Sequence, residues 1–132
     1  MAHEILIIDD EDDIRTQIAG ILADEGYQTR EAANSTDGFS EINARQPSLL
    51  ILDVWLNNSE LDGLQMLELI RRDHTNLQVL VISGHATFDM AVSATKMGAY
   101  DFISKPFKSD VLLLTVERAI EDARLRRENR DL

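Results

Sequence analysis

Short, unbroken runs of aliphatic residues are the feature that most constrains the fold of this chain. The first lies within a predicted strand at Glu4–Ile8, and two others occupy residues 49–52 and 79–82. Runs of this length, rich in isoleucine, leucine and valine, are typical of parallel strands that helices cover on both faces. We therefore predict that they form the buried centre of one sheet. Weaker patterns at residues 27–32 and 100–103 predict two further strands.

Segments with helical periodicity separate the predicted strands. In residues 12–25, apolar side chains recur every three or four positions, which predicts an amphipathic helix. Ser35 and Thr87 are the predicted N-caps of two further helices. Another helix follows Gly63, and the last begins near Ser109. The alternation of five strands with five helices predicts an α/β fold with a doubly wound parallel sheet and right-handed crossovers.

Composition and charge indicate an ordinary single domain and argue against several functions. The 132 residues include 28% charged side chains and carry a net charge of −11. An acidic surface repels phosphate backbones, so we expect no direct binding of nucleic acid. The chain has no cysteine, which excludes disulfides and thiolate ligands, and no stretch long and apolar enough for a membrane span. We therefore expect a soluble, cytoplasmic domain with no membrane partner.

Residues that can bind metal or phosphate follow four of the predicted strands. They are Asp9 and Asp10, Asp53, Ser83, and Lys105. Ligands of open α/β sheets bind beyond the carboxyl ends of the strands, so these side chains should lie together. Converging carboxylates repel each other unless a cation neutralises them, and Mg²⁺ prefers oxygen ligands such as Asp10 and Asp53. A carboxylate can also form an aspartyl phosphate, whose oxygens a lysine and a serine can stabilise.

Each of these residues alone has a more ordinary explanation. An acid after a strand is usually a helix cap or a turn residue, and Ser-Gly is common in turns. A lysine before a proline is usually a surface charge. Their occurrence at separate strand ends of one predicted sheet favours a functional site over these independent explanations.

Together the residues resemble the site of a known family, the receiver domain of bacterial two-component response regulators. The motifs that carry the resemblance are Asp9-Asp10, Asp53, Ser83 and Lys105-Pro106. It covers about residues 4–123, and residues 83–87 and 98–107 resemble the nitrogen-assimilation, NtrC/NtrX-like branch. The resemblance implies a flavodoxin-like (βα)5 fold with strand order 2-1-3-4-5. It also implies a receiver domain at 1–123, with 124–132 beginning a helical linker to an AAA+ and DNA-binding output region that is absent here.

The resemblance gives each site residue a role. Asp53 would accept phosphate from a sensor histidine kinase. Asp10 would bind Mg²⁺ directly, Asp9 would do so mainly through water, and the backbone carbonyl of Trp55 would be another ligand. Lys105 would contact the phosphoryl group, and its bond to the following proline is expected to be cis. Such a domain phosphorylates and dephosphorylates itself and is not a turnover enzyme.

The resemblance also implies a conformational switch. Ser83 and Tyr100 would be the switch pair, with the hydroxyl moving toward the phosphoryl group and the ring turning inward behind it. The fourth helix, fifth strand and fifth helix would form the readout surface. The fourth and fifth helices would also support a phosphorylation-dependent homodimer.

The loop after Asp53 departs from the usual pattern of the family. A proline commonly lies a few residues after the phosphoacceptor, whereas this chain has a longer, proline-free loop up to Asp62-Gly63. A long loop of this kind is similar to that of NtrX-like receivers, and its lack of proline predicts mobility. We expect Trp55 and His85 to flank the phosphoryl group and to slow its hydrolysis.

Two other functions stay open at the level of sequence. One is a Mg²⁺-dependent phosphatase or phosphotransferase acting on small molecules, which would need a substrate pocket and a general acid near the nucleophile. The other is a pseudo-receiver, an interaction module that is never phosphorylated. A pseudo-receiver would lack one of the acids or the lysine, and this chain has all of them.

Overall fold

The computed structural model describes residues 3–84 and 87–131, with side chains described up to residue 126. Its strands are β1 (Glu4–Ile8), β2 (Gln28–Ala32), β3 (Leu49–Asp53), β4 (Gln78–Ser83) and β5 (Asp101–Ser104). Its helices are α1 (Asp12–Asp24), α2 (Ser35–Ala44), α3 (Gly63–Asp73), α4 (Phe88–Lys96) and α5 (Ser109–Asp131). The predicted elements are all present, and their predicted ends lie close to the observed ones.

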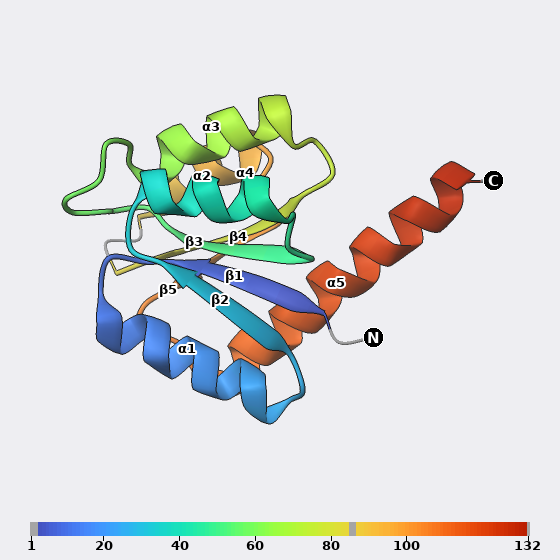
Figure 1. Ribbon diagram of the computed structural model, residues 1–132, viewed down its shortest axis with the longest axis horizontal. Helices are drawn as coiled ribbons and strands as arrows, with labels where there is room; N and C mark the ends of the chain where they lie inside the picture. The colour runs from blue at the N-terminus through green and yellow to red at the C-terminus, as the bar shows by residue number, and fades with distance from the viewer. Residues whose placement is uncertain (1–2, 85–86, 132) are drawn as a thin grey trace.

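The five strands form one parallel sheet in the order β2-β1-β3-β4-β5. Helices α1 and α5 cover one face, and α2, α3 and α4 cover the other (Figure 1). This confirms the predicted doubly wound α/β fold. The register pairs Ile8 with Leu52 and Asp53 with Ile82, so the three central strands end at the same edge of the sheet. Residues that follow these strands are therefore brought together.

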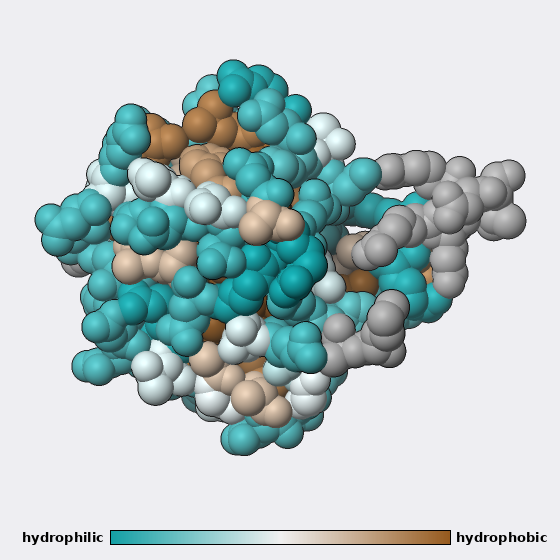
Figure 2. All heavy atoms as spheres, viewed as in Figure 1, coloured by the Kyte–Doolittle hydropathy of each residue, from teal (hydrophilic) through white to brown (hydrophobic). Residues whose placement is uncertain are grey.

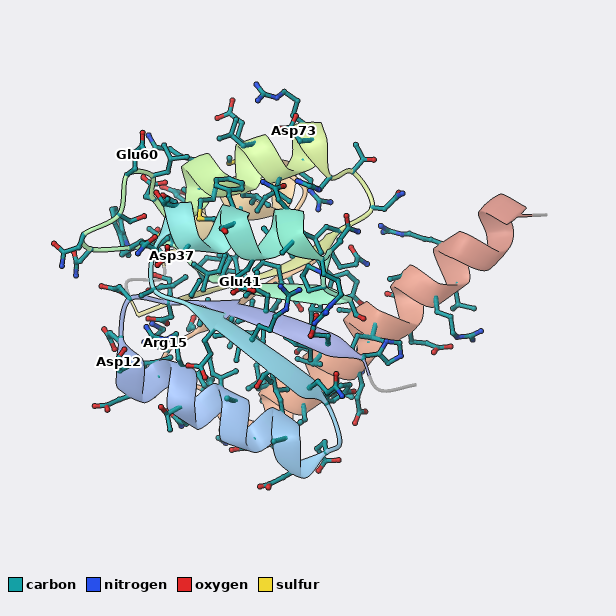
Figure 3. The ribbon with its side chains drawn as sticks, viewed as in Figure 1. Asp12, Arg15, Asp37, Glu41, Glu60 and Asp73 are labelled. Atoms are coloured by element: carbon teal, nitrogen blue, oxygen red, sulfur yellow. The ribbon has the colours of Figure 1, made fainter. Side chains whose placement is uncertain are left out.

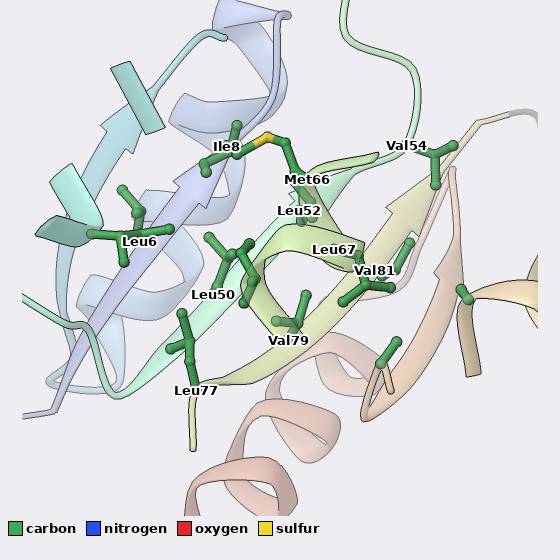
Figure 4. Packing of buried hydrophobic residues seen from close by; sticks show 14 of the residues in the cluster. Leu6, Ile8, Leu50, Leu52, Val54, Met66, Leu67, Leu77, Val79 and Val81 are labelled. Carbon is green, nitrogen blue, oxygen red and sulfur yellow. The ribbon is translucent and has the colours of Figure 1, made fainter. Parts of the chain in front are cut away.

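Side chains that alternate along each central strand divide the core into two clusters. In β1, Ile5 and Ile7 pack toward the α1 and α5 side, whereas Leu6 and Ile8 pack on the opposite side. Figure 4 shows Ile8 beside Met66 of α3 in the second cluster. Full burial of such an aliphatic side chain stabilises the fold by about 1.5–3 kcal/mol. Because the central strands are apolar on both faces, they fix the sheet rigidly beneath its polar edge.

The beginning of α2 differs from the prediction by one residue. Its N-cap is Asn34, whose side chain accepts a hydrogen bond from the Asp37 backbone N–H, and Ser35 is the first helical residue. Asparagine caps helices as well as serine does, so the preceding residue took this role. The prediction for α4 is confirmed, because the Thr87 hydroxyl accepts the Met90 N–H.

Helix α5 continues past residue 123 and projects beyond the rest of the domain (Figure 1). No helix in the described part of the chain is long and apolar enough to cross a bilayer. The face seen in Figure 2 is mostly hydrophilic, with small separate apolar patches.

Candidate functional site

Three carboxylates converge at the carboxyl ends of β1 and β3. Oxygens of Asp9, Asp10 and Asp53 all lie within 4.8 Å of one another. Asp9 is fully buried, Asp53 is 3% exposed and Asp10 is partly exposed. The structure thus brings together the three acids that the sequence places after two strands. Such a concentration of negative charge requires nearby cations.

Lys105 supplies one cation from the segment after β5. Its Nζ lies 2.8 Å from Asp9 Oδ2 and 3.4 Å from Asp53 Oδ2. The Lys105 N–H donates to the Ser83 carbonyl across 2.8 Å, which holds the backbone of Lys105 beside the end of β4. The bond from Lys105 to the following proline is cis, as expected. Burial lowers the pKa of Lys105, but its hydrogen bond to Asp9 and the charges of Asp53 and Asp9 outweigh this and raise it.

The single positive charge of Lys105 does not neutralise the three carboxylates of the cluster. Burial and the neighbouring Asp9 raise the pKa of Asp53 to about 7, although Lys105 opposes this shift. The Asp53 Oδ1 atom is buried and has no hydrogen-bond partner among the described residues. Both observations indicate a site that a further cation would stabilise.

The cavity beside the acids suits a hard divalent cation. It has a volume of about 90 Å³ and is lined by Asp10, Glu11, Asp53, Trp55, Asn57, Gly84 and Lys105. A water molecule occupies about 30 Å³, so the cavity holds an ion and a few waters. Mg²⁺ takes oxygen ligands and keeps several waters, so the donors present fit this metal.

Asp9 is held in place by contacts that engage both carboxylate oxygens. Oδ1 accepts the Glu11 N–H at 2.9 Å, and Oδ2 accepts from Lys105. Arg15 on α1 donates to the Asp9 carbonyl across 2.6 Å and also pairs with Asp12 (Figure 3). Arg15 was not singled out from the sequence. Its spacing of three residues from Asp12 on a predicted helix is the signal that could have found it.

Ser83 and Tyr100 occupy different surroundings. Ser83 is fully buried at the end of β4, next to β3. Tyr100 is half-buried, and its hydroxyl donates to Asp122 Oδ2 on α5 across 2.6 Å. Burial and the hydrogen bond to Asp122 raise the pKa of Tyr100 to about 12. The Tyr100 hydroxyl is therefore engaged with α5 and is not part of the acidic cluster.

Of the two residues expected to flank the phosphoryl group, Trp55 lines the cavity and is 48% exposed. His85 lies outside the described residues. The effect of this pair on hydrolysis stays a prediction.

Hydrogen bonds connect the long loop after β3 to its surroundings, and the mobility that the sequence predicts for this loop stays a prediction. The Gly63 N–H donates to the Val54 carbonyl at 2.8 Å and closes the loop. The Asn57 N–H donates to Asp10 Oδ2 at 3.2 Å. Gly63 is required for this approach, because a Cβ there would lie 2.1 Å from the Asp53 carbonyl oxygen. The loop is thus fastened to the acidic cluster despite its lack of proline.

Comparison with known proteins identifies the class to which this fold and site belong. Residues 5–117 match the response regulator receiver domain, and the chain belongs to that family. This confirms the resemblance and the strand order that it implied.

Individual relatives point to the NtrX-like branch. The chain is 54% identical over 132 residues to the nitrogen assimilation regulatory protein NtrX of Azorhizobium caulinodans, covering 100% of this chain and 29% of that protein. The crystal structure of the NtrX receiver domain from Brucella abortus is 53% identical, with a TM-score of 0.86 over 89% of this chain and 98% of that chain. The beryllofluoride-activated NtrC4 receiver domain dimer is 34% identical, with a TM-score of 0.85 over 91% and 98%. The chain thus spans under a third of its full-length NtrX relative.

Proposed function

We propose that this receiver domain accepts a phosphoryl group on Asp53 from a sensor histidine kinase. The observation that carries the proposal is the position of the Asp53 carboxylate. It is buried beside Lys105, has one oxygen without a hydrogen-bond partner in the described part of the chain, and lines a cavity together with Asp10. A carboxylate in this setting is both shielded and accessible from one side, as a phosphoacceptor must be.

In this proposal, Asp10, Asp53 and the Trp55 carbonyl bind Mg²⁺ directly, and Asp9 contributes through water. The oxygen donors and the size of the cavity support this assignment. The indirect role of Asp9 is supported by the engagement of both its oxygens with Lys105 and the Glu11 N–H. When bound, Mg²⁺ supplies positive charge that offsets the charge of the phosphoryl oxygens.

The transfer needs little more than positioning. An Asp53 oxygen attacks phosphorus, a P–O bond forms, and the P–N bond to the kinase histidine breaks, leaving its electron pair on the imidazole. The Lys105 ammonium then pairs with a phosphoryl oxygen, and the Ser83 hydroxyl donates a hydrogen bond to another. The domain therefore catalyses its own modification. Its cavity of about 90 Å³ is far smaller than the roughly 300 Å³ or more of small-molecule sites, which disfavours a metabolite phosphatase.

Phosphorylation would be read through Ser83 and Tyr100, with a change on the α4–β5–α5 face. Of the elements that form this face, α4 exposes Phe88 at 83% and α5 exposes Leu114 at 48%. Together with the similarity to the NtrC4 receiver dimer, this supports a phosphorylation-dependent homodimer. The output under control would be an AAA+ and DNA-binding region that follows α5 in the longer regulator.

The test is chemical phosphorylation without a kinase. The protein is incubated with Mg²⁺ and acetyl phosphate, and its intact mass is measured. We expect one phosphoryl adduct in the wild type and in Asp24→Asn, which alters an exposed acid of α1. The adduct should be absent in Asp53→Asn and when EDTA removes the metal. A wild type that gains no mass would refute the proposal.

A further inference from the structure

The loop between β3 and α3 is fastened to α2 by a pair of serines. The Ser59 hydroxyl accepts the Ser35 N–H at 2.8 Å and donates to the Leu61 carbonyl at 2.7 Å. In return, the Ser35 hydroxyl accepts the Leu61 N–H at 3.1 Å. We refer to these three bonds as the serine clasp. Two of them join residues that lie 24 and 26 positions apart in the sequence, and the third lies within the loop.

The clasp provides hydrogen-bond partners for backbone groups that would otherwise be unsatisfied. Ser35 is the first residue of α2, and N–H groups in the first turn have no partner within the helix. Ser35 is also only 2% exposed, so water cannot readily replace Ser59. Ser59 uses its hydroxyl both as acceptor and as donor, which an alanine could not do. Two of the three bonds of the clasp therefore depend on this one side chain.

The clasped loop is the one that borders the metal site. Its Asn57 N–H holds Asp10 Oδ2, and Trp55 lines the same cavity as Asp10 and Asp53. Ser59 lies two residues beyond Asn57, whereas Glu60, next along the loop, is exposed to solvent (Figure 3). The loop is thus held at Asp10 on one side and at α2 on the other.

We propose that Ser59 is a positioning residue for Mg²⁺ binding. The serine clasp orders the loop before the metal arrives, so that the Trp55 backbone and the Asp10 carboxylate already have their binding positions. Without the clasp, part of the binding free energy would be consumed in ordering the loop, and the affinity would fall. This inference rests on the proposed function, because it assumes the same metal site.

The test is a Mg²⁺ titration without any phosphodonor, followed by the fluorescence of Trp55, the single tryptophan of the chain. Ser59→Ala should weaken Mg²⁺ affinity about tenfold, a typical effect of losing a residue that supports metal ligands. Ser59→Thr, which keeps the hydroxyl, should restore affinity to within about twofold of the wild type. Ser40→Ala, an exposed serine of α2, is the matched control and should bind as the wild type does.

Amide hydrogen exchange in metal-free protein gives a second readout. In Ser59→Ala, the amides of residues 55–62 should exchange faster than in the wild type. The amides of β1 and β3 should exchange at the wild-type rate, which would also show that the variant is folded. Equal Mg²⁺ affinity in Ser59→Ala and the wild type would overturn the inference alone, as would equal weakening in Ser59→Thr. A wild type that neither binds Mg²⁺ nor takes phosphate would overturn the proposed function together with it.

Discussion

The Tyr100 hydroxyl donates a hydrogen bond to Asp122 across 2.6 Å, which connects the residue before β5 to α5. Asp122 is on α5, the helix that continues past residue 123 and projects beyond the rest of the domain (Figure 1). A residue proposed to move on phosphorylation is therefore bonded to the helix that projects beyond the rest of the domain. If the Tyr100 ring turns inward, as proposed, its hydrogen bond to Asp122 must break.

We expect the Asp122 carboxylate to control the ionisation of Tyr100. The chain has two tyrosines, so Tyr27→Phe leaves Tyr100 as the sole reporter. In that background the Tyr100 pKa should be about 12. Asp122→Asn should lower it toward 10, because the hydrogen bond and the charge that disfavour tyrosinate are reduced. Alkaline absorbance titration measures this, with Glu117→Gln as control, and a pKa unchanged by Asp122→Asn would contradict the bond.

Without a divalent cation, the acidic cluster should destabilise the fold. Burial and Asp9 raise the folded-state pKa of Asp53 to about 7, so its ionisation opposes folding as pH rises from about 4 to 7. At pH 8 in EDTA, Asp53→Asn should raise the free energy of unfolding by about 1–2 kcal/mol. Mg²⁺ should then stabilise the wild type and not the variant. Urea unfolding measures both effects. An Asp53→Asn variant that is less stable than the wild type in EDTA would contradict the expected destabilisation by the Asp53 charge.

Gly63 and Gly20 form a matched pair of glycine positions. Gly63→Ala should destabilise the protein by about 1–3 kcal/mol, because its Cβ would meet the Asp53 carbonyl oxygen at 2.1 Å. It should also impair phosphorylation, since the β3 end must shift. Gly20→Ala in α1 meets nothing within 4 Å and should stabilise by about 0.5–1 kcal/mol. Thermal or urea unfolding measures the change in stability of each variant. Equal changes in Gly63→Ala and Gly20→Ala would refute the steric explanation.

Glu4 should contribute stability that depends on pH. Its hydrogen bond with Arg45, and then the charges of Arg30 and Arg45, lower the pKa of Glu4 below its usual 4.5. The contribution is therefore present above pH 4.5 and is lost as pH falls through the lower folded-state pKa. Glu4→Gln should cost about 1 kcal/mol or less at pH 7, and the cost should be smaller near pH 2. Unfolding curves at both pH values test this, and a loss that persists in acid would disprove the ionic origin.

The sheet and the acids could be predicted because their signals are local. Aliphatic runs identify the three central strands, and a parallel sheet places the residues after them at one edge. The same reasoning placed Lys105 in the cluster, because it follows the last predicted strand. Its closer contact with Asp9 than with Asp53 depends on side-chain packing that no sequence pattern encodes.

Long-range hydrogen bonds could not be predicted either, because they depend on how segments distant in the sequence pack together. The serine clasp joins Ser35 and Ser59 because of the path that the loop follows after Asp53. Ser35 was expected to cap α2, but Asn34 does so and leaves the Ser35 hydroxyl to the loop. The lack of proline led us to predict a mobile loop, but it carried no information about the hydrogen bonds that the loop forms.

The central claim is that Asp53, and neither neighbouring acid, takes the phosphoryl group. Borohydride reduces an acyl phosphate to an alcohol, so an aspartyl phosphate becomes homoserine, which peptide mass spectrometry can locate. After treatment with acetyl phosphate and Mg²⁺, we expect homoserine at position 53 alone. Lys105→Met should reduce its yield strongly, and Lys108→Met, which changes an exposed lysine nearby, should not. Homoserine at Asp9 or Asp10, or none anywhere, would contradict the account.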